Sequence, residues 1–437
     1  PDRVRARMHL VWLLAAGGEK AVDELLEVAG QDSSTRVRVQ AVRAVADLVD
    51  PVLVGNMLDS GPGDSAIAGR LADLVGSKAE ASAEVHREVI VALGRLKWPG
   101  LPKWLAGHKP TTLDAVRLHA GQQALRRVAN WPETLKLLDL PSAHPARAMA
   151  LRAVADRYDE TVVEWLIEKL KSDPRPQRRR EYAEWLTRVW RKPAAWKYWG
   201  YRPAPRPVNP ADWEQTTAIA TALGGLLRDK DRRVRVTVLR TMRRQGVPIA
   251  SAVLSEWLAS ERDDKAVGEL LEAMKAEVSD ASTSALLGVV SAAAYSPANR
   301  LSALAVLDQR FKGAAGSRLV TLGGKLEQGP VLAELLERLG RREGLDSGGL
   351  FEAGIGSTDA SVRAAAITAS AHRGDRRLAG RLGKLLGDKA STVRRAAAAA
   401  VGRLKVKKLA ADLSRTVTDP EAPVRSAGLA ALVTLEH

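Results

Sequence analysis

One motif occurs three times near the end of the chain, as Asp359-Ala-Ser-Val-Arg-Ala-Ala-Ala, Ala390-Ser-Thr-Val-Arg-Arg-Ala-Ala and Glu421-Ala-Pro-Val-Arg-Ser-Ala-Gly. The Val-Arg pairs begin at residues 362, 393 and 424, so the spacing is 31 residues in both intervals. A unit of this length is too short for a domain of its own and long enough for two short helices with their turns. The spacing therefore predicts an array of helical hairpins.

The same signature occurs further upstream with less regular spacing. Clear copies are Arg36-Val37-Arg38 and Arg233-Val234-Arg235, and weaker copies begin at Val4, Val116 and Ala146. A polar turn with Asp before the motif can cap the free amides of the next helix. We expect the Val to point inward, and the small residues after it to let neighbouring helices approach closely. The Arg is expected to reach back to the preceding turn and bind its carbonyls or its Asp.

This pattern resembles HEAT repeats, specifically the short kind first associated with phycobilisome lyases. The resemblance is clearest over residues 30–50 and 355–437 and weaker over 225–340. It implies a stack of two-helix repeats, because one hairpin cannot bury its own apolar stripe. It does not imply phycobilin attachment, since most proteins with these repeats are not lyases.

The predicted fold class is all-α, an α-solenoid that forms a right-handed superhelix. The composition agrees, because only 2 Phe and 5 Tyr accompany the many small aliphatic residues, which suit closely packed helices better than sheets. The predicted organisation has HEAT-like repeats over 1–173, a Trp/Pro/Arg-rich insert over 174–212, and further HEAT-like repeats over 213–437. The chain begins with Pro1 rather than Met, so we expect a processed chain or a piece of a longer protein.

The predicted insert interrupts the repeat. Three prolines at alternate positions in Arg202-Pro-Ala-Pro-Arg-Pro207 favour an extended segment over a helix. Five of the 11 tryptophans, at positions 185, 190, 196, 199 and 213, lie in this region. In one interpretation these rings pack the irregular segment against the solenoid.

In the other interpretation the aromatic and basic residues of the insert form a docking surface. Aromatic and Arg side chains are the usual places where binding energy concentrates, and such faces can also stack on bases, sugars or cationic groups. The candidate partner-binding residues are Trp185, Trp196, Tyr198, Trp199, Tyr201, Arg202 and Arg206.

Part of the insert carries a second resemblance. The segment from Tyr198-Trp-Gly-Tyr-Arg-Pro203 to Trp213-Glu214 is similar to a motif in large exported planctomycete-type proteins. Those proteins join a sugar-dehydrogenase-like propeller, HEAT repeats and a c-type haem domain. The resemblance implies a spacer or docking module of an exported, redox-linked assembly. The redox activity itself is not implied, because neither the propeller nor the haem segment is found in this chain.

No motif indicates catalysis. The chain has no Cys, which excludes disulfides, a thiolate nucleophile, Cys-based zinc sites and a covalently attached c-type haem. Its 7 histidines lack the spacing of a metal site, and neither a Gly-x-Ser-x-Gly elbow nor a phosphate-binding loop occurs. No apolar run approaches the ~18 residues of a membrane span. We therefore predict a non-enzymatic protein without cofactor or metal.

The charge leaves two functions open. The chain has 67 basic and 51 acidic residues, a formal net charge of +16, which raises the question of a polyanionic partner. The alternative function is nucleic-acid binding by a basic groove, with a HEAT-like alkylpurine DNA glycosylase as its enzymatic form. However, basic residues are followed by acidic ones along most of the chain, and the largest basic excess, over 175–206, is local. We therefore predict a scaffold that docks a protein partner or neighbouring domains.

Overall fold

The computed structural model describes residues 2–75, 82–108, 114–194, 210–275, 280–311 and 316–436. The regular structure of these residues is helical, apart from an isolated antiparallel bridge between Lys192 and Ala211. The chain divides into two compact units, residues 1–222 and 223–437. None of the described helices is both long and apolar enough to span a membrane. The predicted all-α fold is confirmed.

The first unit contains α1 (Asp2–Ala15), α2 (Val22–Gln31), α3 (Thr35–Val49), α4 (Pro51–Gly55), α5 (Ser65–Asp73), α6 (Ala83–Arg95), α7 (Leu101–Gly107), α8 (Ala115–Val128), α9 (Trp131–Lys136), α10 (Pro145–Val154), α11 (Glu160–Ser172) and α12 (Pro176–Arg188). Helix α13 (Thr216–Leu226) lies at the boundary of the two units.

The second unit contains α14 (Arg232–Gln245), α15 (Ser251–Ser260), α16 (Asp264–Met274), α17 (Asp280–Ser291), α18 (Pro297–Arg310), α19 (Ser317–Gly323), α20 (Pro330–Gly340), α21 (Gly348–Ile355), α22 (Ala360–His372), α23 (Ala379–Leu385), α24 (Ser391–Arg403), α25 (Ala410–Arg415) and α26 (Ala422–Glu436). Short 3-10 turns precede or follow several helices, at Gly18–Ala21, Leu137–Asp139, Arg376–Leu378, Lys407–Leu409 and Thr416–Thr418.

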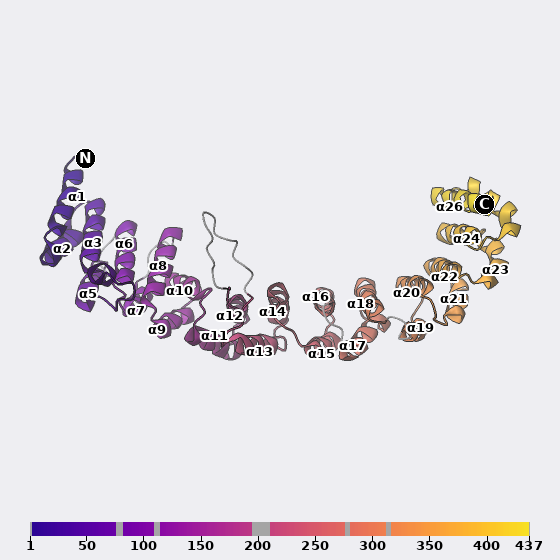
Figure 1. The fold of residues 1–437 in the computed structure, drawn as a ribbon, viewed down its shortest axis with the longest axis horizontal. Helices are drawn as coiled ribbons and strands as arrows, with labels where there is room; N and C mark the ends of the chain where they lie inside the picture. Colours follow the sequence, from indigo (N-terminus) through magenta and orange to yellow (C-terminus); the bar gives the residue numbers. More distant parts are fainter. Residues whose placement is uncertain are drawn as a thin grey trace. The chain divides into compact units, whose positions relative to one another are not determined.

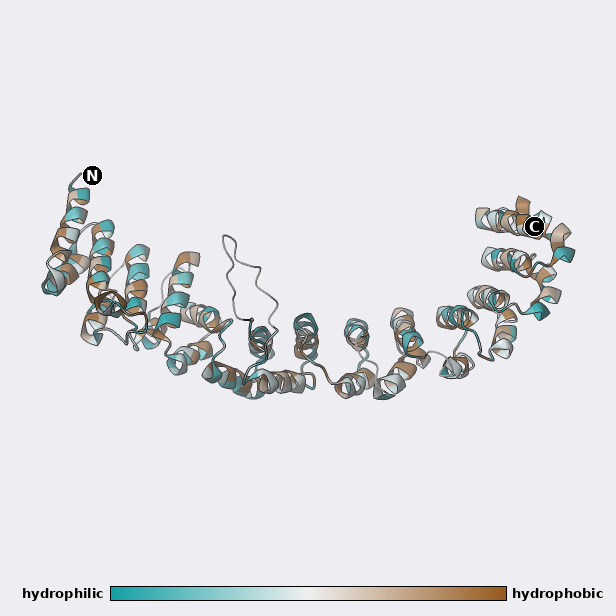
Figure 2. Cartoon of the chain, viewed as in Figure 1, coloured by the Kyte–Doolittle hydropathy of each residue, from teal (hydrophilic) through white to brown (hydrophobic). Residues whose placement is uncertain are grey.

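Within each unit the helices alternate between two rows (Figure 1). In the first unit α3, α6, α8 and α10 follow one another in one row, and α7, α9 and α11 form the other. In the second unit α14, α16, α18, α20, α22, α24 and α26 make one row. The helices carry apolar and polar residues on different faces (Figure 2), and most of the buried apolar residues lie between the rows. Each unit is thus an α-solenoid of two-helix repeats.

The Arg of the repeat motif connects successive repeats. In α22, Arg363 donates to the carbonyl oxygens of Ser357 and Thr358, both at 3.0 Å, in the turn before its own helix. Its Nε and Nη2 atoms donate to Asp388 of the following repeat at 3.1 and 2.9 Å. Asp388 also accepts from the backbone N–H of Ala390 at 2.9 Å. The predicted contact with the preceding turn is confirmed, and the Arg also binds the next turn.

The following repeat has the same arrangement. Arg394 donates to the carbonyl oxygens of Asp388 and Lys389 at 3.0 and 3.2 Å and to the carboxylate of Asp419 at 2.7 and 2.9 Å. Arg425 donates to the carbonyl oxygens of Asp419 and Pro420. Each turn is therefore held both by its own repeat and by the previous one.

Two of the weaker motif copies have a different register from the predicted one. In α1, Arg7 rather than Arg5 makes the ion pair with the next turn, at 3.0 Å from Asp32. In α8, Val116 is 56% exposed and Arg117 is only 4% exposed. The prediction of an inward Val116 was wrong, because Arg117 takes the buried position, with its Nε 2.8 Å from the carboxylate of Asp114.

A buried histidine lies between the rows of the first unit. His86 of α6 packs against Trp104 of α7 with ring centroids 5.5 Å apart, and His108 stacks on Trp104 at 4.4 Å. Burial lowers the pKa of His86 to about 4, and the nearby charges of Arg117 and His108 act in the same direction. His86 is therefore neutral in the folded chain at pH values where a free histidine is already protonated.

We expect this histidine to make the first unit less stable as the pH falls from about 6.5 to about 4. In that interval the unfolded chain takes up a proton that buried His86 does not. The free energy of unfolding is therefore unaffected by this group above a pH of about 6.5 and falls steadily as the pH drops to about 4. The difference between the two pKa values corresponds to about 3 kcal/mol.

Urea unfolding of the wild type and of His86→Gln at pH 7.5 and 4.5, followed by circular dichroism, measures this contribution. The wild type should lose about 2–3 kcal/mol more than the variant between the two pH values. An equal loss in both proteins would show that His86 does not cause the acid sensitivity.

Candidate docking surface at the base of the insert

Two buried arginines fix the start of α12, the helix that forms the first part of the predicted insert. Arg178 donates to the carbonyl oxygens of Leu138 and Leu140 at 3.0 and 2.7 Å, and Arg179 donates to that of Asp173 at 2.8 Å. Both side chains are buried, so these charge-assisted bonds replace the water that they lose on folding. These two arginines therefore hold the helix in place and are not a free cationic surface.

Asp173 strengthens the same turn. Its carboxylate accepts from the backbone N–H of Arg175 at 2.9 Å and pairs with the guanidinium of Arg175 at 2.8 Å. Burial alone would raise the pKa of Asp173, but the hydrogen bonds from Arg175 outweigh it and lower the pKa. The carboxylate is therefore ionised at neutral pH, when it can hold the turn before α12.

Helix α12 packs on the solenoid through an apolar face. Tyr182 and Leu186 are buried, and the Val189 and Trp190 side chains that follow the helix are buried as well. The ring of Trp165 in α11 meets Tyr182 edge-on, with centroids 5.7 Å apart. Trp190 thus belongs to the core, as expected if part of the aromatic cluster packs the irregular segment against the solenoid.

Within the insert, the residues on either side of segment 195–209 are joined to each other. The backbone N–H of Lys192 donates to the carbonyl of Ala211 at 2.7 Å, and the reverse bond measures 3.2 Å. Arg191 lies 2.7 Å from Asp212, and Lys192 lies 3.5 Å from Glu214. We define these residues as the clamp. The clamp brings both ends of segment 195–209 to one place on the first unit.

Trp213 packs onto the clamp. Its Nε1 atom donates to the carbonyl oxygen of Val189 at 2.8 Å, and the Lys192 ammonium lies 4.6 Å from the ring centroid. The ring of Tyr158 meets Trp213 edge-on at 5.7 Å. Just after it, Gln215 donates to Glu160 of α11 at 3.0 Å. The indole thus joins the returning chain to the end of α12 and to the segment before α11.

Trp185 is the only predicted partner-binding residue among the described residues. It is half-buried on α12, with the Arg188 guanidinium 4.8 Å above its ring. Arg188 is exposed and also pairs with Glu184 at 3.1 Å. The other predicted residues, which are Trp196, Tyr198, Trp199, Tyr201, Arg202 and Arg206, lie outside the described residues.

Most of the cations among the described residues of this region are engaged within the fold. Arg178 and Arg179 bind backbone carbonyls, and other cations of 175–192 pair with carboxylates. Among the described residues, no group of three or more His, Asp or Glu side chains could hold a metal ion. The described part of the region can therefore offer an aromatic ring with a cation above it, which suits contact with a protein surface.

Sequence reasoning missed three parts of this arrangement. Tyr158 and Glu160 lie far from the aromatic segment in sequence and gave no signal. Asp212 was a recognisable partner for a basic residue, but its pairing with Arg191 depends on the antiparallel bridge. The buried positions of Arg178 and Arg179 were missed as well. For Arg179 the motif Arg was a usable signal, because Arg179 binds the carbonyl six residues before it, as Arg363 and Arg394 do.

Comparisons with known proteins agree with the repeat architecture. Residues 349–433 match a family model of HEAT repeats, so this stretch carries HEAT repeats. Among solved structures the chain is similar to Kap121p bound to Ste12p, at 15% identity and a TM-score of 0.46, over 95% of this chain and 44% of Kap121p. The chain thus spans less than half the length of Kap121p. No curated protein sequence matches it.

Two further solved structures align with it along nearly their whole length. An Escherichia coli protein, YibA, is 16% identical over 76% of this chain and all of its own, with a TM-score of 0.32. Human deoxyhypusine hydroxylase in complex with glycerol is 16% identical over 73% of this chain and 98% of its own, with a TM-score of 0.26. Likeness at these identities concerns the fold. The helix rows themselves show that each unit is a helical-repeat solenoid, and the family match places HEAT repeats over residues 349–433.

Proposed function

We propose that this chain is a non-enzymatic scaffold that docks a protein partner or neighbouring domains through the insert of residues 174–212. The clamp carries the proposal. It holds the two ends of an aromatic, basic segment together on the first unit. Joining the ends in this way reduces the entropy cost of binding a partner through that segment. An aromatic residue topped by an Arg, as at Trp185 and Arg188, is a common binding hot spot.

The proposed setting is an exported, redox-linked assembly of which this chain is the spacer or docking module. Support comes from the motif between Tyr198 and Glu214 that resembles the exported planctomycete-type proteins. The division into repeats over 1–173 and 213–437 on either side of the insert belongs to the same proposal. In it, the two arrays present the insert and connect it to adjacent domains.

We expect Trp185→Ala/Trp199→Ala to lose the partner that the wild-type chain retains. The test is a quantitative pull-down from the source cells, with protein ratios measured by mass spectrometry. Trp12→Ala is the matched control, because Trp12 is an exposed tryptophan of α1 far from the insert in sequence. At least one protein should fall about tenfold in the double variant and stay unchanged in the control. Equal recovery with all three baits would overturn the proposal.

Nucleic-acid binding is tested on the same proteins. Fluorescence anisotropy with short single- and double-stranded DNA across a salt series should show no tight binding at about 50 mM salt. Tight binding with a steep salt dependence, weakened by Arg202→Ala, would favour the basic-groove function instead. A glycosylase would in addition release a damaged base from such DNA.

A further inference from the structure

A second surface of the first unit has the chemistry of a binding pocket and lies outside the insert. It is a hollow of about 280 Å³ between α6 and α8, which are neighbours in one helix row (Figure 1). Gly94, Ala120 and Ala124 are its small lining residues. The two helices approach so closely at Gly94 that an added Cβ there would lie 2.6 Å from the Cα of Ala124. Because the side chains at this close helix crossing are small, they leave an unfilled hollow next to it.

The apolar walls of the hollow are Val91 and Val116. Val116 is 56% exposed, although the inward Val of regular repeats, as at Val362 and Val393, is fully buried. The difference arises because Arg117 takes the buried position in α8 and turns its neighbour outward. An exposed Val facing a small-residue hollow leaves apolar surface in water, and covering it with another apolar group would be favourable.

The rim of the hollow is cationic. Arg87 and Arg127 line it together with His119 and Gln123, and no carboxylate is among the lining residues. Within the described ranges neither Arg87 nor Arg127 forms an ion pair, whereas Arg95 on the same helix α6 pairs with Asp47 and Asp50 at 2.7 and 2.8 Å. These two arginines therefore remain available for carboxylates from outside the chain.

We propose that this hollow binds an acidic protein segment through one bulky apolar side chain, with flanking carboxylates paired to Arg87 and Arg127. Its volume of about 280 Å³ is slightly below the range of small-molecule sites, which measure about 300–1,000 Å³, and suits a single anchoring side chain. The apolar walls favour a peptide over a nucleic acid, whose phosphates need polar donors rather than Val91 and Val116. The pocket extends the proposed scaffold role to a second partner segment but does not depend on the insert.

The test is fluorescence anisotropy of a labelled short peptide with one Phe between Glu and Asp residues, titrated with the full chain. Binding should weaken about tenfold or more for Val116→Glu and for Arg87→Glu/Arg127→Glu. The same peptide with Ser in place of Phe should bind about tenfold more weakly. Arg152→Glu is the matched control, because Arg152 is an exposed Arg on the neighbouring helix α10 outside the pocket lining, and it should change binding little.

Each other result would overturn the proposal. No binding of the acidic Phe peptide, or binding that Val116→Glu and the double Arg variant leave unchanged, would remove the site. Displacement of the peptide by a short DNA strand, but not by unlabelled peptide, would assign the arginines to nucleic acid. Thermal unfolding checks that the variants keep their fold, which is expected because Val116 and Arg127 are exposed and Arg87 is half-buried. Trp185→Ala/Trp199→Ala should bind the peptide normally, so failure of the insert and failure of this pocket are separate results.

Discussion

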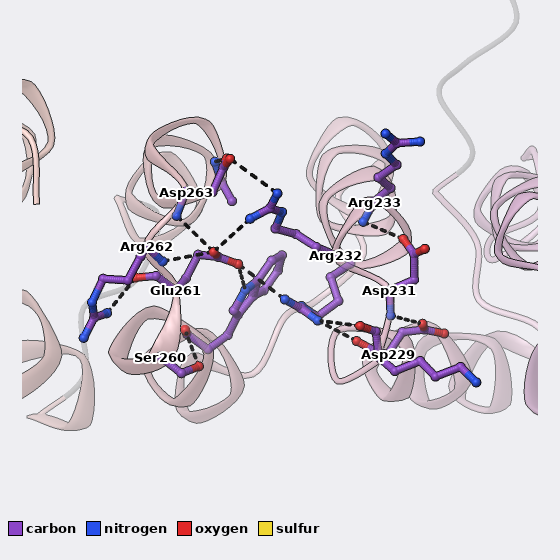
Figure 3. A network of polar contacts seen from close by, with 12 residues as sticks. Asp229, Asp231, Arg232, Arg233, Ser260, Glu261, Arg262 and Asp263 are labelled. Atoms are coloured by element: carbon purple, nitrogen blue, oxygen red, sulfur yellow. Dashed lines mark hydrogen bonds and ion pairs between the residues drawn. The ribbon is translucent and has the colours of Figure 1, made fainter.

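Replacing Glu261 with Ala is expected to lower the free energy of unfolding of the second unit by about 3–5 kcal/mol, the usual cost of removing one partner of a buried ion pair. Glu261 is only 7% exposed. Its carboxylate accepts from Trp257 Nε1 at 3.0 Å and from the backbone N–H groups of Arg262 and Asp263 at 3.0 and 3.1 Å (Figure 3). Arg235 lies 3.3 Å away. The substitution leaves all these donors without their acceptor.

The charge of Glu261 gives this prediction a pH dependence. Burial alone would raise the pKa of Glu261, but hydrogen bonds from Trp257, the backbone and Arg235 outweigh it and lower the pKa to about 2. The folded-state pKa lies below the unfolded value of about 4.5, so the carboxylate stabilises the fold at higher pH. This contribution is lost as the pH falls from about 4.5 towards 2.

Hydrogen exchange with mass spectrometry measures the opening of the second unit within the full chain. The matched control is Glu256→Ala. Glu256 also pairs with an arginine, Arg228, at 2.8 Å, but its side chain is 65% exposed, so its removal should cost less than about 1 kcal/mol. If both variants exchange faster by the same amount, the burial of Glu261 and its additional donors contribute nothing to the free energy of unfolding.

The repeats were predictable because their physical requirement recurs at a fixed spacing. A buried Val, a small-residue face and an Arg that binds the preceding turn recur in every regular repeat, so the sequence around Val362, Val393 and Val424 repeats them. The partner of each Arg was only half predictable. The preceding turn is local, whereas the second acceptor, such as Asp388 for Arg363, is set by how the next repeat stacks.

Departures from the repeat were not predictable from the pattern. In α8 a buried Arg117 satisfied by Asp114 replaces the inward Val, and a one-residue change of register turns Val116 outward. Hydrophobicity alone cannot indicate this, because an Arg with a local carboxylate can occupy a buried position. At the insert, the sequence showed the aromatic cluster, but the clamp depends on residues on both sides of segment 195–209 that only the fold brings together.

Replacing both Gly340 and Gly402 with Val is expected to lower the free energy of unfolding of the second unit by about 2–6 kcal/mol. An added Cβ on Gly340 would lie 2.5 Å from the Cα of Ala369, and one on Gly402 would lie 2.9 Å from the Cα of Ala431. Both clashes involve backbone, which cannot rotate away as a side chain can, so α20 must separate from α22, and α24 from α26. Overpacking of this kind costs about 1–3 kcal/mol per site, and sites without shared partners are nearly additive.

Gly380→Val at a third helical glycine separates this steric effect from helix propensity. An added Cβ on Gly380 of α23 meets no atom within 4 Å, so Val there should be neutral or slightly stabilising, by less than about 1 kcal/mol. Because each repeat of a solenoid contacts only its neighbours, the damage should also be local. Gly402→Val alone should increase the hydrogen-exchange rate of α26 much more than that of α14 or α16. Uniformly faster exchange across the second unit would instead mean that its repeats unfold as one cooperative block. The contact between α24 and α26 would then not determine the stability of the C-terminal repeat by itself.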